Sequence, residues 1–176
     1  MLKKQARLLG VSIWLRNKNE ATAIGVVFRG NSWLDGVLSC RIDLTKRNNW
    51  LKLSKAIMKS KQYSQLHATI LTRAAVRSGV SVADLSDGLK LPVIAMITRN
   101  HTSTFTKNKL GTKNYKLLVN GKRISVLAKG VTFEEAQEIF DVACKPDSSL
   151  PEATRVADLI AKHALADVTE PGASNA

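Results

Sequence analysis

Residues 8–15 (LLGVSIWL), 21–29 (ATAIGVVFR) and 33–43 (WLDGVLSCRID) are three apolar, β-prone stretches in close succession. The polar residues 16–20 (RNKNE) separate the first stretch from the second, and Gly30-Asn31 turns the chain before the third. Strands that are joined by turns this short usually pair with their neighbours in sequence. This opening segment therefore predicts a three-stranded antiparallel meander.

After the meander, helical and extended patterns alternate. The elements that we expect are a helix at 45–60, a strand at 66–71, a helix at 81–89, a central strand at 92–97, a short basic helix at 102–110, a hairpin of 115–119 and 123–127 around Asn120-Gly121, a helix from the capping box at Thr132 to about Cys144, and a last helix from Pro151 to about Ala166. This order predicts an α/β fold with an RNase H-like mixed sheet flanked by helices, although many α+β folds begin in the same way. We expect residues 1–166 to form a single domain and 167–176 a flexible C-terminal tail.

Charge is divided unevenly along the chain. Residues 1–130 hold 24 Lys and Arg against 5 Asp and Glu, a net +19, whereas residues 131–176 hold 3 against 9, a net −6, and together they give +13. A field of this size attracts polyanions, of which nucleic acid is the commonest in a cell. We therefore expect nucleic acid as the partner, with a merely solvated basic surface or an anionic membrane surface as the alternatives.

Other features of the composition narrow the class of protein. No apolar run reaches the roughly 18 residues that a membrane span requires, and we expect a cytoplasmic protein that does not bind membranes. Cys40 and Cys144 lack metal or redox spacing and are interpreted as reduced, buried thiols. Only 5% of the residues are aromatic, and Trp14, Trp33 and Trp50 lie in apolar runs where we expect them in the core. Recognition of a backbone and its shape, as in structured RNA, is favoured over stacking on bases.

The candidate nucleic-acid-binding residues are cations in three groups and one single arginine. The first group lines or flanks the helix expected at 45–60, the second brackets a Thr/Asn-rich stretch, and the third lies at the hairpin tip as a phosphate clamp. They are Lys46, Arg47, Lys52, Lys55, Lys59 and Lys61, then Arg99, Lys107, Lys109, Lys113 and Lys116, then Lys122 and Arg123, together with Arg73. Each group could instead be a solvated face. High basicity also suggests a ribonucleoprotein such as the ribosome as the setting.

The stretch Leu150-Pro-Glu-Ala-Thr-Arg-Val-Ala-Asp158 is the most specific motif in the chain. From its pattern alone it is a helix start, in which Arg155, Asp158 and Lys162 share a surface ion-pair face. It resembles the C-terminal signature of endonuclease V and of an archaeal uncharacterised family related to endonuclease V. Residues 25–30 (GVVFRG), 33–39 (WLDGVLS) and 91–95 (LPVIA) resemble the archaeal family as well. The resemblance spans most of residues 8–165 and implies an RNase H-like fold.

The resemblance also implies phosphodiester cleavage assisted by metal ions, for which carboxylates must converge on Mg²⁺. At the positions where the family holds its metal this chain has Ser12, Ile42 and Thr72, and only Asp158 is retained, although Asp35 and Asp84 also match acidic positions of the archaeal family. Arg73 directly follows Thr72 in the sequence, and its positive charge would repel a metal cation. The sequence therefore predicts a divergent member without catalytic residues, metal or other cofactor, which binds nucleic acid but does not cut it.

Two alternatives remain open. Asp35, Asp84 and Asp158 could form a relocated Mg²⁺ or Mn²⁺ site, which would make the chain an endonuclease that acts on RNA or DNA. Glu134, Glu135, Glu138 and Asp141 could dock a basic partner, unless they pack against the chain's own basic half, which is the arrangement that we expect. The oligomeric state, the choice of RNA over DNA and the specific target are not encoded in residue types.

Overall fold

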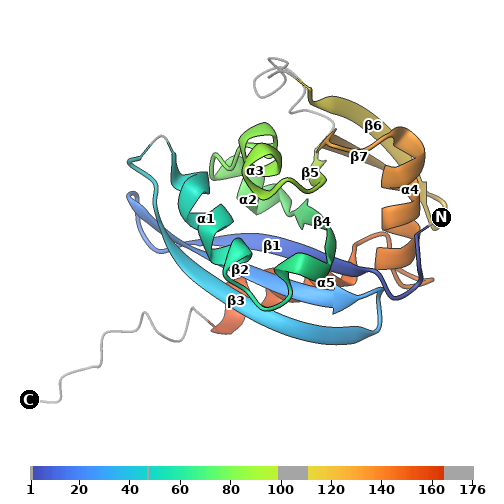
Figure 1. Cartoon of the computed structure of the whole chain (residues 1–176), viewed down its shortest axis with the longest axis horizontal. Helices are drawn as coiled ribbons and strands as arrows, with labels where there is room; N and C mark the ends of the chain where they lie inside the picture. Colours follow the sequence, from blue (N-terminus) through green and yellow to red (C-terminus); the bar gives the residue numbers. More distant parts are fainter. Residues whose placement is uncertain (1, 47, 99–110, 165–176) are drawn as a thin grey trace, which may run out of the picture.

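The protein is described here by a computed structural model, in which residues 2–46, 48–98 and 111–164 are placed (Figure 1). Its centre is one seven-stranded sheet in the order β3-β2-β1-β4-β5-β7-β6. The strands β1, β4 and β5 run parallel to one another, and all other neighbours pair antiparallel. Their bounds are β1 Arg7–Leu15, β2 Glu20–Arg29, β3 Trp33–Asp43, β4 Leu66–Leu71, β5 Val93–Ile97, β6 Lys113–Val119 and β7 Lys122–Lys129. The predicted meander and mixed sheet are confirmed.

Helices cover both faces of the sheet (Figure 1). One face packs against α1 (Asn49–Met58) and α3 (Val82–Leu89), and its core includes Leu9, Val11 and Ile13 of β1. The other face packs against α4 (Phe133–Ala143) and α5 (Glu152–Leu159). The remaining helical elements are α2 (Arg73–Arg77), the 3₁₀ turn η1 (Tyr63–Gln65) and the π-helical turn η3 (Ile160–Ala164). β1 is buried on both faces because helices cover both sides of it.

Local chemistry explains where several elements begin and turn. The capping box at the start of α4 is formed: Glu135 N donates to Thr132 Oγ1, and Thr132 N donates to Glu135 Oε2. Asn120 and Gly121 have φ of 48° and 76°, which two-residue hairpin turns require and which Asn and Gly adopt most readily. These sequence predictions are confirmed.

The first helix begins later than the sequence predicts. Thr45 N and Thr45 Oγ1 both donate to Asp43 Oδ1, at 3.0 and 2.6 Å, so the chain first makes a turn after β3. The helix then begins at Asn49 rather than at Thr45. Residues 73–77 form a short helix that periodicity did not indicate, because five residues are too few to show a helical repeat.

The prediction that all three tryptophans are core residues is wrong for Trp33, whose side chain is 67% exposed at the start of the edge strand β3. Trp14 and Trp50 are half-buried. Cys40 and Cys144 are free thiols. Cys144 is buried, as expected, whereas Cys40 is only half-buried. Within the described residues, no helix is long and apolar enough to cross a membrane. The expected basic helix at 102–110 and the expected tail at 167–176 lie outside the described residues.

The close approach of α5 to β1 positions the C-terminal motif. A Cβ atom on Gly10 would collide with the backbone of Ala153 and Thr154 in the first turn of α5. The small residues Ala153, Ala157 and Ala161 then pack against Ile24 and Val26 of the neighbouring strand. A residue without a side chain at position 10 is therefore what lets α5 lie directly on the sheet.

Replacement Gly10→Ala is expected to lower the free energy of unfolding by about 3 kcal/mol, because an extra methyl group in a packed contact forces backbone shifts. Urea denaturation followed by circular dichroism measures the loss. Gly88→Ala in α3 is the control, since its Cβ would meet the edge of the Trp50 ring at 3.1 Å rather than a backbone; a change within about 1 kcal/mol is expected there. Equal effects of the two substitutions would contradict the close approach.

Candidate functional site

A cleft of about 540 Å³ lies at the C-terminal ends of the parallel strands β1 and β4, between α2 and α5. Ligands of open α/β sheets commonly bind at this end of the strands, where strand ends and helix starts converge. Its lining comes from β1, the junction of β4 and α2, α2 itself, β5, the loop before α5, α5 and η3. The residues are Ile13, Leu15, Thr72, Arg73, Ala74, Arg77, Ser78, Met96, Leu150, Thr154, Arg155, Asp158, Leu159 and Lys162.

Three of the four positions at which the resemblance places metal-binding residues meet at this cleft. Thr72 Oγ1 donates to Ser12 Oγ at 3.2 Å, and Ser12 Oγ donates to Asp158 Oδ1 at 3.1 Å. Ser12 and Thr72 are fully or almost fully buried, whereas the side chain of Asp158 is 31% exposed. Asp158 Oδ2 also accepts from Lys162 Nζ at 2.5 Å. The positions thus form a chain of hydrogen bonds that ends in a single ion pair.

Ile42 does not join these three residues. It is 2% exposed and packs with Leu53 and Ile57 in the core on the α1 face of the sheet, opposite to α5. The sequence match at this position therefore does not correspond to a position in the cleft.

The residues present do not fit a divalent metal ion. Mg²⁺ takes about six oxygen ligands, and proteins usually hold it through one or two available carboxylates together with waters and substrate phosphates. The cleft offers one carboxylate, whose two oxygens are already engaged by Ser12 and Lys162. Across residues 2–46, 48–98 and 111–164, no three His, Cys, Asp or Glu side chains gather in a way that could hold a metal.

The relocated carboxylate site is not formed either. Asp35 lies on β3 between two arginines: Arg7 Nε donates to it at 2.5 Å and Arg29 Nη2 lies 2.9 Å away. The hydrogen bond from Arg7 lowers the pKa of Asp35, and Arg29 lowers it further. Asp84 lies in the first turn of α3, and Asp158 on α5. The three carboxylates thus belong to separate places in the fold.

A second cleft continues the first. It has a volume of about 350 Å³ and is lined by Arg73, Met96, Ile97, Thr98, Lys122, Arg123, Ile124, Ser125, Ser149 and Leu150. Arg73, Met96 and Leu150 line both clefts, which are therefore contiguous. We call the two together the groove. Its lining has six cationic side chains, Arg73, Arg77, Lys122, Arg123, Arg155 and Lys162, and one carboxylate, Asp158.

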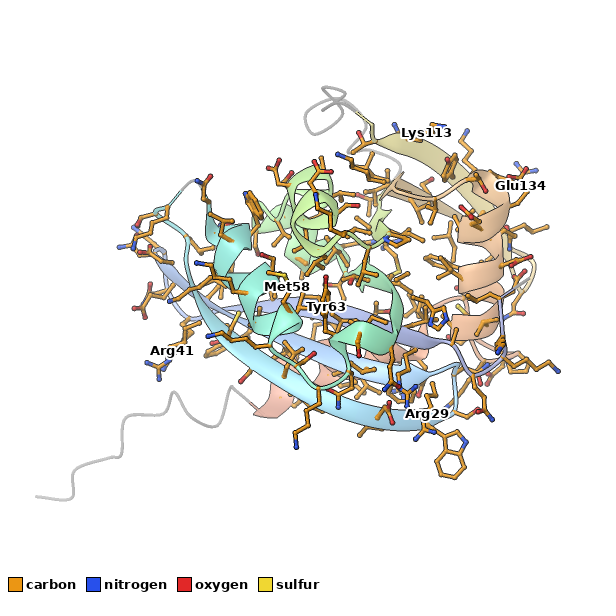
Figure 2. All side chains as sticks on the ribbon, viewed as in Figure 1. Arg29, Arg41, Met58, Tyr63, Lys113 and Glu134 are labelled. Atoms are coloured by element: carbon orange, nitrogen blue, oxygen red, sulfur yellow. The ribbon has the colours of Figure 1, made fainter. Side chains whose placement is uncertain are left out.

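The groove gathers only some of the predicted cations. Arg73, Lys122 and Arg123 line it, but the described lysines of the first group are exposed on or beside α1 and do not line it. Lys113 and Lys116 are exposed on the edge strand β6, and Figure 2 shows Lys113 at the outer end of the molecule, far from Arg41 of β3. Arg47, Arg99, Lys107 and Lys109 lie outside the described residues. Basic charge thus occupies several surfaces, and the groove is a hollow one with six cationic side chains.

Sequence reasoning missed Arg77 and gave Arg155 and Lys162 only a surface role. Arg77 reaches the groove because Thr72 caps α2, with Ala75 N donating to Thr72 Oγ1 at 3.3 Å. A Thr directly after a buried strand is the signal that could have indicated this short helix. The predicted hairpin clamp, Lys122 and Arg123, does face the groove.

Glu152 is a buried carboxylate at the start of α5, with its side chain 4% exposed. Arg155 Nε and Nη2 donate to it at 2.9 and 2.5 Å, and Lys145 Nζ at 3.0 Å. The hydrogen bond from Arg155 lowers the pKa of Glu152 and outweighs burial, which alone would raise it. This pair holds Arg155 along the wall of the groove.

The other acidic residues of the C-terminal part do not pair as we expected. Glu134, Glu135 and Asp141 are exposed on α4 and make no ion pair with residues of the described ranges. Glu134 lies on the outside of the molecule near β6 (Figure 2). Glu138 Oε2 accepts from Leu2 N at 2.8 Å. Helix α4 thus packs against β6 of the basic half, but Glu134, Glu135 and Asp141 add no ion pair to that contact within the described residues, and none of the three lines the groove.

Comparison with known proteins places this geometry in a family. The family model described as endonuclease dU matches residues 4–165. The chain belongs to the endonuclease dU family. A UPF0215 protein of Methanosarcina acetivorans is 28% identical to this family member over 180 residues, which span 91% of each chain. The predicted relation to an archaeal family is confirmed.

Solved structures show the fold of this endonuclease dU family member. A protein of unknown function from Archaeoglobus fulgidus has a TM-score of 0.71 at 19% identity and covers 89% of this chain and 96% of its own. Human endonuclease V has a TM-score of 0.64 at 16% identity, with coverages of 94% and 87%. Endonuclease V of Ciona intestinalis, solved with a 24mer DNA that contains an inosine followed by a ribo-adenosine, has a TM-score of 0.63 at 12% identity, with coverages of 93% and 87%. The predicted RNase H-like fold is confirmed.

Glu152 is expected to make the stability of the fold sensitive to acid. Its pKa in the folded state lies below its ordinary value of 4.5, so its contribution is complete above that value and disappears as the pH falls through the folded-state pKa. Glu152→Gln should therefore cost about 1–2 kcal/mol at pH 7 and progressively less as the pH falls below 4.5. Urea unfolding between pH 3 and pH 7 measures this. The exposed Glu20→Gln is the control, and a cost of Glu152→Gln that did not change with pH would contradict the ion pair.

Proposed function

We propose that the chain is a non-catalytic nucleic-acid-binding protein on an endonuclease V-like scaffold, and that the groove is its phosphate-binding surface. The observation that carries this proposal is the lining of the groove, with six cationic side chains and one carboxylate. Backbone phosphates are bound by arrays of Lys and Arg, and acidic groups in the same surface reduce the affinity. Arg73 is the central residue of this surface, because it lines both clefts.

The absence of cleavage is supported by the chemistry at the strand ends. Two hydroxyl groups and one lysine-bound carboxylate occupy the place where cleavage would require converging carboxylates. Neither hydroxyl can supply the negative charge that holds a divalent ion beside a phosphate. The matched family carries an endonuclease name, so a member without this site is a binder that keeps the scaffold.

Structured RNA is the ligand that we favour, in a cytoplasmic ribonucleoprotein such as the ribosome. No aromatic side chain lines either cleft within the described residues, so unpaired bases have no stacking platform there. Recognition by backbone and shape suits folded RNA, whose helices expose phosphates and 2′-hydroxyl groups. The net charge of +13 suits the same setting. The endonuclease V of Ciona intestinalis, which shares this fold, was solved in complex with a DNA that contains a ribo-adenosine after its inosine.

Binding should depend steeply on salt and on the groove cations. Arg73→Gln/Arg123→Gln is expected to weaken binding of an RNA hairpin about tenfold or more and to lower the slope of log affinity against log salt by about 2. Lys55→Gln/Lys59→Gln removes the same charge from the exposed face of α1 and should change the affinity by about twofold at most. Fluorescence anisotropy from 50 to 300 mM KCl with RNA and DNA, each single- and double-stranded, measures both. Larger losses in the α1 variant would move the interface to α1, and salt-independent or absent binding would refute the proposal.

Nuclease assays test the non-catalytic part. With Mg²⁺ or Mn²⁺, no cutting is expected of RNA or DNA that contains inosine, or of DNA that contains deoxyuridine, because the cleft lacks converging carboxylates. Gel analysis of end-labelled substrates after overnight incubation measures this. Metal-dependent cutting that disappears in Asp158→Ala would establish the endonuclease alternative instead, and cutting that persists in Asp158→Ala would indicate a contaminating nuclease.

A further inference from the structure

Asp158 and Lys162 form an ion pair between two residues that line the groove. Both residues lie on the same continuous helical segment, Asp158 near the end of α5 and Lys162 in the π-helical turn η3. Lys162 Nζ lies 2.5 Å from Asp158 Oδ2, and Asp158 Oδ1 accepts from the buried Ser12. Ser12 in turn accepts from Thr72. The ammonium group is therefore anchored at the three converging positions described above.

An ordinary ion pair between helix residues four apart would be weak and mobile, because both side chains would be solvated. This pair differs in one respect: the carboxylate is held from behind by Ser12, which is completely buried. The location of Asp158 is thus fixed by the sheet, and Lys162 is directed to the mouth of the cleft. Arg73 and Arg77 on α2 line the same cleft and make no ion pair with other residues of the described ranges.

We propose that the Lys162 ammonium takes the place of the divalent cation that the scaffold is built to hold, and that it binds a backbone phosphate of the nucleic acid without any metal. The single charge of Asp158 is balanced by Lys162, so an additional divalent ion would meet only the positive field of Arg73 and Arg77. An ammonium group has three N–H donors, and Asp158 takes one of them. The side chain of Lys162 is 65% exposed, so the other two can reach a phosphate in the cleft.

This inference rests on the proposed function for its phosphate ligand, but the exclusion of metal does not depend on nucleic acid. The two parts can therefore be measured separately. The first measurement is isothermal titration of the wild-type protein and of Asp158→Asn with Mn²⁺ alone. Identical traces for the two proteins are expected. Mn²⁺ binding by the wild type that Asp158→Asn abolishes would overturn the inference, whether or not nucleic acid binds.

The second measurement compares binding of the RNA hairpin in EDTA and in Mg²⁺, at matched ionic strength, by wild-type protein and by Lys162→Gln, Lys162→Arg and Lys59→Gln. Wild-type affinity should be the same in EDTA and in Mg²⁺. Lys162→Gln should weaken binding about tenfold and reduce the salt slope by about 1, whereas Lys162→Arg should keep the affinity within about threefold. Lys59→Gln removes an exposed lysine that follows α1 and does not line the groove, and this variant should behave as wild type.

The outcomes separate the two ideas. If no nucleic acid binds to the wild type at any salt concentration, the proposed function fails, and the Mn²⁺ titration alone judges whether Lys162 excludes metal. If nucleic acid binds but EDTA abolishes the binding, or if Lys162→Gln binds as tightly as wild type, the groove function stands and the substitution of metal by lysine is refuted. A loss in Lys162→Gln that Lys162→Arg restores, together with insensitivity to EDTA, is the result that the inference requires.

Discussion

The contact between the first turn of α5 and Gly10 of β1 sets the positions of the polar groups that α5 and η3 contribute to the groove. Because Gly10 has no side chain, the helix backbone lies directly on the sheet, and the alanines that follow pack against β2. The short distance between helix and sheet brings Asp158, farther along the same helix, within hydrogen-bond distance of Ser12. It also places Arg155 and Lys162 along the cleft. The pairing of Glu152 with Arg155 and Lys145 fixes the start of the helix as well. The close approach of the α5 backbone to Gly10 thus determines where Arg155, Asp158 and Lys162 lie in the groove.

The division of charge between the two halves of the sequence does not correspond to a division of charge between surfaces of the folded protein. Residues 131–176 carry a net charge of −6, yet α5 and η3 together contribute one carboxylate and two cations to the groove. The acidic residues of α4 line neither cleft, so they do not dilute the positive charge of the groove. The surface that attracts a polyanion is therefore assembled from both halves of the chain: Arg73, Arg77, Lys122 and Arg123 come from the basic half, and Arg155 and Lys162 from the acidic one.

The parts of the fold that sequence predicts well are those that neighbouring residues determine. The meander, the hairpin at Asn120-Gly121 and the capping box at Thr132 depend on contacts over a few residues, and each is found as expected. The groove depends on contacts such as that between Ser12 and Asp158, which are 146 residues apart in the sequence. A local sequence pattern cannot predict a contact between residues so far apart. Trp33 is a second example of a feature that depends on long-range contacts. The apolar run that contains Trp33 does not indicate that β3 lies at the edge of the sheet, where the Trp33 side chain is exposed. The resemblance to endonuclease V supplied the missing long-range information for Ser12, Thr72 and Asp158, but it misplaced Ile42.

The residues at the cleft are mutually dependent, which explains why hydroxyl groups and a lysine occur together. A carboxylate at the fully buried position of Ser12 would lie beside Asp158 and pay the cost of burying a second negative charge unless a metal balanced it. Ser12 instead donates to Asp158, so the buried groups are satisfied without a metal. With the carboxylates reduced to one, a single ammonium group suffices to neutralise it, and Lys162 supplies that charge. Each of these features is unfavourable without the others: Lys162 would compete with metal in a site of several carboxylates, and Asp158 would lie partly buried and unpaired without Lys162. The charges of the cleft are therefore balanced without a metal, as the proposed phosphate site requires, and a single added acidic residue would disturb that balance before it could restore a metal site.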